Sequence, residues 1–397
     1  MFRSSGIRAS LIVLVLLVSG TTFAFSASAA SGPRTDNWTI ALYVGADNNL
    51  EVAWDDYSLP ALLGIPASKR VNIVALVDRL STDGLELIEF SGDTYEVVDT
   101  WDEMNTGDGA TFALFLDMVE EQYPAENMCI IPWNHGGSWR GFCSDDSSTV
   151  VAPSDVVVGD IIRMNEFSDA LSQAALQIDV LAFDACIMSA VEVAYEAYTT
   201  GMVTYMVASE MYVPFDGFPY DLMFAPLAED PTATPEQLID MMLLGWDGYY
   251  HSGRQLNLVV TDVEAMGASL PAYKAWSNAL IDGLDEYSAA YEAAVTAAIG
   301  SDYAGPMPDV HDLCEQLIIN VDDVTIQDAC RDVMAAVEET VVALHTGGWA
   351  QDMHGLSIWW LTFDPTYWYH IDQYDEGVAF AEDAGWSAFL RAYNSLP

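Results

Sequence analysis

One histidine and one cysteine stand where their side chains could support thiol chemistry. His135 follows an apolar run in the sequence WNHGG at 133–137, and Cys186 follows a second apolar run in the sequence DAC at 184–186. A thiolate attacks a carbonyl carbon and a thiol does not, so a nucleophilic cysteine needs a base within reach. If the two apolar runs form neighbouring strands, the imidazole and the thiol meet at one edge of a sheet.

Each residue also has a purely structural explanation. A cysteine after an apolar strand is often a small buried hydrophobe, and a histidine beside two glycines can mark a tight turn. The two residues together favour chemistry, because both follow predicted strands and open α/β sheets bind ligands at that edge.

The elements that must position this pair follow from the apolar pattern. Near-continuous apolar runs predict buried strands at 38–44, 71–77, 128–133, 178–183 and 205–209. Helical spacing at 111–121 and 167–176 falls between them. This alternation predicts an α/β fold with a mostly parallel central sheet sandwiched by helices. Ligands then bind beyond the carboxyl ends of the strands. The residues at those ends are 47–49, 78–79, 134–137, 184–186 and Glu210.

The domain organisation is predicted from the change in composition near residue 265. We expect an α/β domain over 36–265 and a helical region over 266–397, with Ala-rich helices such as 287–299. A late strand at 355–361 could return to the main sheet.

The first residues predict export. Arg3 and Arg8 precede an apolar run at 11–18, and an A-x-A site ends at Ala29. This is the pattern of a secretory signal peptide over 1–29, and its apolar run is too short to cross a bilayer. We therefore expect a secreted, extracellular protein.

The charge balance limits the partners. Sixty acidic against twelve basic residues give a formal net charge of −48. Nucleic acids and anionic membranes would be repelled, so neither is expected as a partner. The acids run along the whole chain, which favours adaptation to a salty medium over a dedicated acidic tail. The oligomeric state stays open.

Cysteines and metal ligands give weaker signals. The odd number of cysteines predicts a free thiol. Cys314 and Cys330 are close enough in sequence to form a disulfide, but the pairing stays open. The six histidines form no closely spaced ligand pattern, which disfavours a metalloenzyme, and the acids form no Asp-x-Asp-x-Asp-Gly loop. The metal site is therefore unknown.

The segments around His135 and Cys186 resemble the clostripain-like cysteine peptidases of the caspase-like clan. The resemblance rests on 133–137 and 183–189, and on further stretches at 43–51, 192–210 and 355–359. It covers almost all of the chain after residue 29, with the histidine before the cysteine as in that clan. It implies a caspase-like α/β sandwich and endopeptidase activity on proteins or peptides, commonly after Arg or Lys. It also implies calcium as a frequent requirement, although the chemistry itself needs no cofactor.

Roles for individual residues follow from this chemistry. Cys186 is the expected nucleophile and His135 the expected proton carrier, with the backbone N–H groups of Gly136 and Cys186 as the oxyanion hole. Asp184 shares a strand face with Cys186, so its carboxylate would favour a basic P1 side chain, although a turn-forming Asp is the alternative. A second pocket carboxylate is expected from Asp216 or Asp221.

Two further expectations concern activation and the alternative function. Residues 140–149 have the composition of an exposed loop, and Arg140 is the expected self-cleavage site there. A chain that works uncut is the competing view. The alternative function is an exported binding or adhesion module with the same fold and no catalysis.

Overall fold

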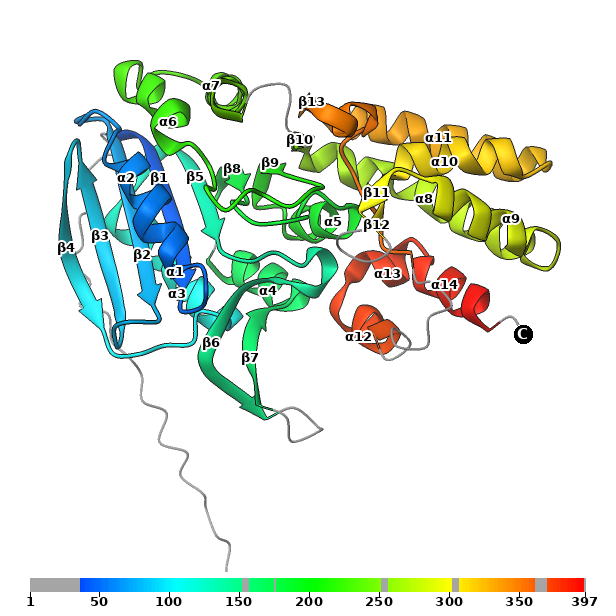
Figure 1. Cartoon of the computed structure of the whole chain (residues 1–397), viewed down its shortest axis with the longest axis horizontal. Coiled ribbons are helices and arrows are strands. Elements are labelled where there is room, and N and C mark those ends of the chain that lie inside the picture. Colours follow the sequence, from blue (N-terminus) through cyan, green and yellow to red (C-terminus); the bar gives the residue numbers. More distant parts are fainter. Residues whose placement is uncertain are drawn as a thin grey trace, which may run out of the picture.

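The computed structural model describes residues 36–151, 157–174, 176–250, 256–301, 307–360 and 370–395. Within these residues the centre of the molecule is a nine-stranded sheet in the order β13-β10-β9-β8-β5-β1-β2-β3-β4 (Figure 1). The middle strands are mutually parallel, and they are β1 (Asp36–Ala46), β2 (Val71–Arg79), β5 (Ala125–Trp133), β8 (Ile178–Ala182) and β9 (Val203–Ala208). All the strands predicted on the parallel sheet are confirmed.

Antiparallel strands complete both edges of the sheet. β3 (Leu85–Ser91) and β4 (Thr94–Trp101) extend it beyond β2, while β10 (Asn257–Asp262) and β13 (Val341–Thr346) extend it beyond β9. β4 is exposed along most of its length and β13 is at best half-buried. Such strands lack the continuous apolar run that marks a central strand, so the sequence did not reveal them.

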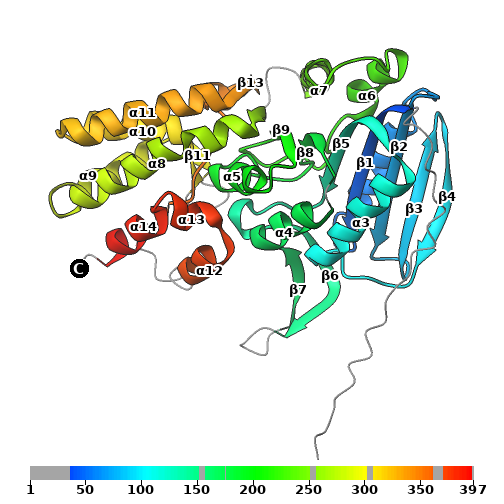
Figure 2. The same cartoon turned by 180° about the vertical axis from the view of Figure 1, so that it is seen from behind.

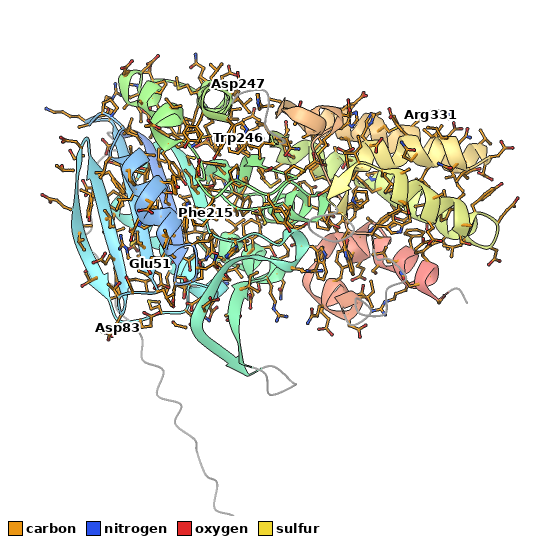
Figure 3. The ribbon with its side chains drawn as sticks, in the orientation of Figure 1. Glu51, Asp83, Phe215, Trp246, Asp247 and Arg331 are labelled. Carbon is orange, nitrogen blue, oxygen red and sulfur yellow. The ribbon has the colours of Figure 1, made fainter. Side chains whose placement is uncertain are left out.

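Helices cover both faces of the sheet, as Figures 1 and 2 show from opposite sides. One face carries α1 (Glu51–Ala53), a π-helical turn (Trp54–Ser58), α2 (Leu59–Leu62), α6 (Tyr220–Glu229) and α7 (Pro235–Tyr250). The other face carries α3 (Gly109–Gln122), α4 (Met164–Ala174) and α5 (Val191–Thr200), which confirms the helices predicted at 111–121 and 167–176. Trp246 of α7 packs into the apolar cluster of the first face, while its neighbour Asp247 lies on the outer side of the helix (Figure 3).

The C-terminal part is mainly helical, as predicted. It contains α8 (Val263–Asp282), α9 (Leu284–Ala297), α10 (Val310–Asn320), α11 (Val324–Thr340), α12 (His370–Gly377), α13 (Ala379–Asp383) and α14 (Trp386–Asn394), with the short pair β11 (Gly300–Ser301) and β12 (Met307–Pro308). The boundary expected after residue 265 falls inside α8. One buried cluster joins α5, α8 and α14, so the division into domains stays a prediction.

The expected strand at 355–361 is wrong for the residues that the structure describes. Residues 355–360 form no strand of the main sheet, and only Ser357 makes isolated bridges, to Ala190 and Asp309. The segment is apolar because it runs through the interior between the start of α5 and α10. An apolar run records burial and does not tell a strand from a buried irregular segment. The late strand of the sheet is β13. Leu361 lies outside the described residues.

No helix within the described ranges is both long enough and apolar enough to cross a membrane. The predicted signal peptide at 1–29 lies outside those ranges.

Candidate active site

The loops that carry His135 and Cys186 leave the sheet side by side. β5 and β8 are adjacent and parallel, and Trp133 pairs with Asp184 just beyond β8. The N–H of Asp184 donates to the carbonyl of Pro132 at 3.0 Å, and the N–H of Asn134 donates to the carbonyl of Asp184 at 3.3 Å. The prediction that the two strands are neighbours is therefore confirmed.

Gly136 lies directly against the backbone of Cys186. A Cβ atom at position 136 would lie 2.2 Å from the carbonyl oxygen of Cys186 and 2.9 Å from its nitrogen. Only a glycine leaves room for this contact. Among the described residues, the N–H groups of Gly136 and Cys186 have no hydrogen-bond partner, so both can donate to a ligand.

Cys186 begins a tight turn that is strained at the next residue. Ile187 has a φ of 53°, which β-branched residues rarely adopt. Its N–H donates to the carbonyl of Met211 at 2.9 Å, and that bond helps to hold the turn. Strain of this kind persists where the surrounding contacts enforce it. The thiol is therefore presented on a fixed backbone.

The Cys186 thiol is half-buried and protonated at neutral pH. Burial raises the pKa of Cys186 to about 11, and the nearby Asp184 adds to the shift. The thiol can donate to the carbonyl oxygen of Val213, which lies 3.8 Å from Sγ. A base must therefore remove the proton during attack.

The His135 ring is held by Asn49. The Nε2 atom lies 2.9 Å from Oδ1 of Asn49, and because that oxygen only accepts, Nε2 carries a proton. In the neutral ring Nδ1 is then the acceptor. Burial lowers the pKa of His135, with Asp146 opposing the shift, so the neutral ring is favoured. The sequence placed Asn49 at a strand end but assigned it no role, since only the fold brings it to His135.

A network of amides ties three strand ends together behind His135. The Asn48 side chain donates to the Ser144 carbonyl at 2.8 Å and lies 3.2 Å from Oδ1 of Asn134. Asn134 donates to the carbonyls of Gly45 and Ser144. β1, β5 and the start of β6 (Phe142–Val151) are therefore joined at this edge.

Asp184 anchors the loop that follows β9. Its Oδ2 accepts the N–H of Phe218 at 3.0 Å and the O–H of Tyr220 at 2.7 Å. Burial raises the pKa of Asp184 to about 6, and these two hydrogen bonds oppose the shift. The same loop contains Val213, the acceptor for the Cys186 thiol. Asp184 therefore has a structural role whatever it does for substrate.

The structure separates the two further candidate acids. Asp216 precedes Gly217, whose backbone packs on the Asp184 carboxylate, and its Oδ2 accepts the O–H of Tyr249 at 3.1 Å. Asp221 lies in the first turn of α6, against Gly64 after α2. Of the two, Asp216 is the one whose neighbour in the chain, Gly217, packs on Asp184.

The expectation of an exposed loop at 140–149 is wrong. Arg140 ends a 3₁₀ turn (Ser138–Arg140), and β6 follows and pairs with β7 (Val157–Ile162). Arg140 itself is exposed, with its guanidinium 5.7 Å from the centre of the Trp139 ring. Phe142, Cys143 and Asp145 are buried. The segment forms a hairpin in spite of its small polar residues, because one side of the hairpin is buried against the ends of the central strands.

The five cysteines all lie in the described residues and all are free thiols. Cys314 and Cys330 lie side by side and share a hydrogen bond without a disulfide, and burial raises the pKa of Cys314. Cys186 is half-buried, whereas the other four are buried. The predicted free thiol is therefore confirmed.

One cluster of side chains has the composition of a metal site. Asp47, Asp78, Glu103 and Asp145 each place a carboxylate oxygen within 4.8 Å of the others. The cluster lies where β1 and β2 end. It adjoins the Asn48–Asn134 network, because Asp145 follows Ser144, whose carbonyl accepts from both amides.

Comparison with known proteins identifies the family of the chain. The model of the Clostripain family matches residues 42–393. Clostripain from Hathewaya histolytica is 32% identical over 222 residues, which cover 47% of this chain and 41% of that protein. The match thus spans less than half of that relative's length.

Solved structures show the same fold. A secreted C11 cysteine protease from Bacteroides thetaiotaomicron, in complex with an irreversible peptide inhibitor, has a TM-score of 0.67 at 16% identity and covers 88% of this chain and 99% of its own. An inactive zymogen C11 protease from Parabacteroides distasonis has a TM-score of 0.66 at 18% identity and covers 89% of this chain and 99% of its own.

These neighbours confirm the expected caspase-like α/β sandwich. Because the family model matches most of its length, the chain belongs to the clostripain family of cysteine peptidases.

Proposed function

We propose that this protein is a secreted cysteine endopeptidase in which Cys186 is the nucleophile and His135 carries the proton. The observation that supports this most is the contact of Gly136 with the Cys186 backbone, which brings the two loops together at one sheet edge. Two free N–H groups at that contact supply the donors that an acyl-transfer site needs.

Acylation starts from a neutral thiol and a neutral imidazole. As Sγ of Cys186 attacks the scissile carbonyl carbon, Nδ1 of His135 takes the thiol proton. The N–H groups of Gly136 and Cys186 donate to the oxygen that becomes negative, and each such donor is typically worth about 3 kcal/mol. His135 then gives its proton to the departing amine, the C–N bond breaks and a thioester remains.

Deacylation uses the same groups in reverse. His135 takes a proton from a water molecule, and the resulting hydroxide attacks the thioester carbon. The C–S bond breaks, the peptide leaves with a new carboxyl group, and His135 returns the proton to the sulfur of Cys186. Every proton in this cycle is held by protein, substrate or water, so the chemistry needs no cofactor.

The preference we propose is for Arg or Lys at P1. Asp216 belongs to the loop after β9 that contacts the Cys186 thiol, and Asp184 accepts a hydrogen bond from the same loop. A carboxylate at this place can form a charge-assisted hydrogen bond with a basic side chain. The net charge of −48 would also draw basic peptides toward the protein.

A catalytically silent binding module is the second candidate function. The observation that favours it is the Cys186 thiol, whose pKa is raised and whose proton is bonded to the Val213 carbonyl. On this view the edge binds peptide without cleaving it.

Labelling of the mature protein by a thiol-reactive peptide ketone with Arg at P1 separates the two functions. Mass spectrometry should find one label per chain, on Cys186, together with cleavage of a matching peptide substrate. Cys186→Ala should lose both, and His135→Ala should lose cleavage to a similar extent. The double variant should be no slower than either single variant, because the two residues act as one unit. Binding of peptide without label or cleavage would favour the silent module. A Cys143→Ala control removes a buried thiol and should still be labelled.

Mass spectrometry of the same protein also tests export and self-processing. The N-terminus of secreted protein should begin at Ala30. If the enzyme processes itself, a cut after Arg140 should occur in wild type and be absent from Cys186→Ala. Because Gly141 and Phe142 enter the β6–β7 hairpin, such a cut requires local opening of buried backbone. An active, uncut chain would show that cleavage is unnecessary.

A further inference from the structure

The four carboxylates of the acidic cluster come from segments far apart in the sequence. Asp47 follows β1, Asp78 lies at the end of β2, Glu103 follows β4, and Asp145 belongs to β6. Asp47, Asp78 and Asp145 are at most 2% exposed, whereas Glu103 reaches the surface. In Figure 3, Glu51 and Asp83, which follow β1 and β2 in the chain, mark this end of the sheet.

Protein groups hold some of the carboxylate oxygens and leave others without a partner. Oδ2 of Asp78 accepts the O–H of Thr106 at 2.8 Å, and the two oxygens of Asp145 accept the N–H groups of Thr106 and Ser148. By contrast, Oδ1 of Asp47 and Oδ1 of Asp78 are buried without a hydrogen bond. A buried carboxylate oxygen in this state calls for a proton or a cation.

No basic side chain of the described residues forms an ion pair with this cluster. Arg79 follows Asp78 directly, but its guanidinium pairs with Glu86 at 2.8 Å and with Asp55 at 3.6 Å. Packing four acids together without a counter-charge destabilises the folded chain. A bound cation at this position would supply the missing positive charge.

The family resemblance implies calcium without saying where it would bind, and we propose that Asp47, Asp78, Glu103 and Asp145 are the residues that bind it, as one hard divalent cation. The donors are all oxygen, which suits Ca²⁺ and Mg²⁺ better than Zn²⁺ or Cu²⁺. Oxygens on opposite sides of a Ca²⁺ ion lie about 4.6–5.2 Å apart, and the four donors here lie within 4.8 Å of one another. Mg²⁺ needs a tighter octahedron, with opposite oxygens about 4.0–4.2 Å apart.

The site connects to the edge of the sheet that carries His135. Asp47 lies two residues before Asn49, whose side chain holds the His135 ring. The N–H of Asp146 donates to the carbonyl of Asp47 at 2.9 Å, so the β1 turn and β6 are already joined there. A cation between Asp47 and Asp145 would fix this junction and, through it, the position of Asn49.

Calorimetric titration of Ca²⁺ into chelator-treated Cys186→Ala protein tests the proposal. This variant keeps the cation measurement separate from peptidase activity, so failure of one proposal leaves the other standing. Asp47→Asn and Asp78→Asn each remove one charge at nearly constant shape. Since they also relieve repulsion, both should fold and melt in chelator at or above the temperature of the parent. The matched control is Asp83→Asn, because Asp83 is exposed and lies near Glu103 without belonging to the cluster.

We expect one saturable Ca²⁺ site per chain, weaker binding of Mg²⁺, and a higher melting temperature when Ca²⁺ is present. Asp47→Asn and Asp78→Asn should each weaken Ca²⁺ binding at least tenfold and remove the thermal shift, while Asp83→Asn should change neither. High sodium chloride screens diffuse attraction and should leave the site measurable. Absence of saturable binding, or equal loss in all three variants, would overturn the proposal.

Discussion

The Asn49 side chain fixes the tautomer of His135. Its Oδ1 lies 2.9 Å from Nε2 of the ring, so the ring proton sits on that nitrogen and Nδ1 is unprotonated, as the proposed mechanism requires of the base. Asn49 stands in the turn after β1, and His135 follows β5, which is the next strand in the sheet. In the proposed mechanism Asn49 is a positioning residue that acts through His135.

Asn49→Ala should lower kcat by about five- to tenfold, the size of one net hydrogen bond of about 1–1.4 kcal/mol, with little change in KM. Asn49→Asp should move the acid limb of the kcat–pH profile to higher pH. The sign follows because a carboxylate beside the ring favours imidazolium, so the base stays protonated up to a higher pH. A profile that does not move in the Asp variant would assign Asn49 a structural role.

Gly136→Ala should abolish most activity, because its Cβ would meet the Cys186 carbonyl oxygen at 2.2 Å and force the two loops apart. We expect at least a hundredfold loss in kcat/KM and about 1–3 kcal/mol lower stability. Gly137→Ala is the matched control, since a Cβ there would lie 3.3 Å from its nearest neighbour, the Gly141 carbonyl oxygen. Its activity should stay within about threefold of wild type. Similar losses in both variants would argue against a special role for the Gly136 contact.

Asp184→Asn should weaken cleavage after Arg and Lys by about 1.5–3 kcal/mol and affect a neutral P1 residue less. The amide oxygen can still accept from Phe218 and Tyr220, so the loop should remain folded. Because the pKa of Asp184 is raised to about 6, its negative charge is lost as the pH falls through 6. The preference of wild type for basic P1 residues should therefore decline below pH 6.

The Asn variant should lack that pH dependence, as measured by kcat/KM for paired Arg and Ala substrates. Asp216→Asn should also reduce the preference, whereas Asp221→Asn, which changes an acid packed against Gly64, should not. Equal losses for basic and neutral substrates in Asp184→Asn would mean that Asp184 serves only the loop.

Glu192 should make the protein less stable as the pH rises. It is buried in α5, where its Oε1 accepts the Trp359 N–H at 2.8 Å and the Tyr374 O–H at 3.1 Å. Burial raises the pKa of Glu192 to about 7, from about 4.3 in an unfolded chain. The folded state then binds more protons between these values, so its contribution is full below about pH 4 and is lost as the pH rises through 7.

Glu192→Gln keeps an acceptor for both donors and cannot ionise. Urea unfolding at pH 5 and pH 8 should show a smaller fall in stability for this variant than for wild type, and the variant should be the more stable of the two at pH 8. Glu376→Gln, a change at an exposed acid of α12, should leave the wild-type slope intact. If Glu192→Gln loses as much stability between pH 5 and pH 8 as wild type does, other buried acids such as Glu196 cause the pH dependence.

The sequence by itself determined the central parallel strands and the order of His135 and Cys186 along them. Strands covered on both faces must be apolar at nearly every position, so the chain records them as continuous runs. Because parallel strands end at one edge of the sheet, the residue types that follow them also predicted a thiol site at that edge. The same reasoning failed at 355–360, because an apolar run records only that a segment is buried, and there the covering elements leave it irregular.

Only the tertiary structure decided which distant groups meet. Asn49 reaches His135, and Asp47 reaches Asp78, Glu103 and Asp145, because β1 packs beside both β5 and β2. The contact of Gly136 with Cys186 likewise depends on how two loops close over the sheet edge. Local patterns carry no information about such contacts, since each of these residues alone reads as an ordinary turn or surface residue. The roles that we propose for them arise from strand order and from the burial that strand order imposes.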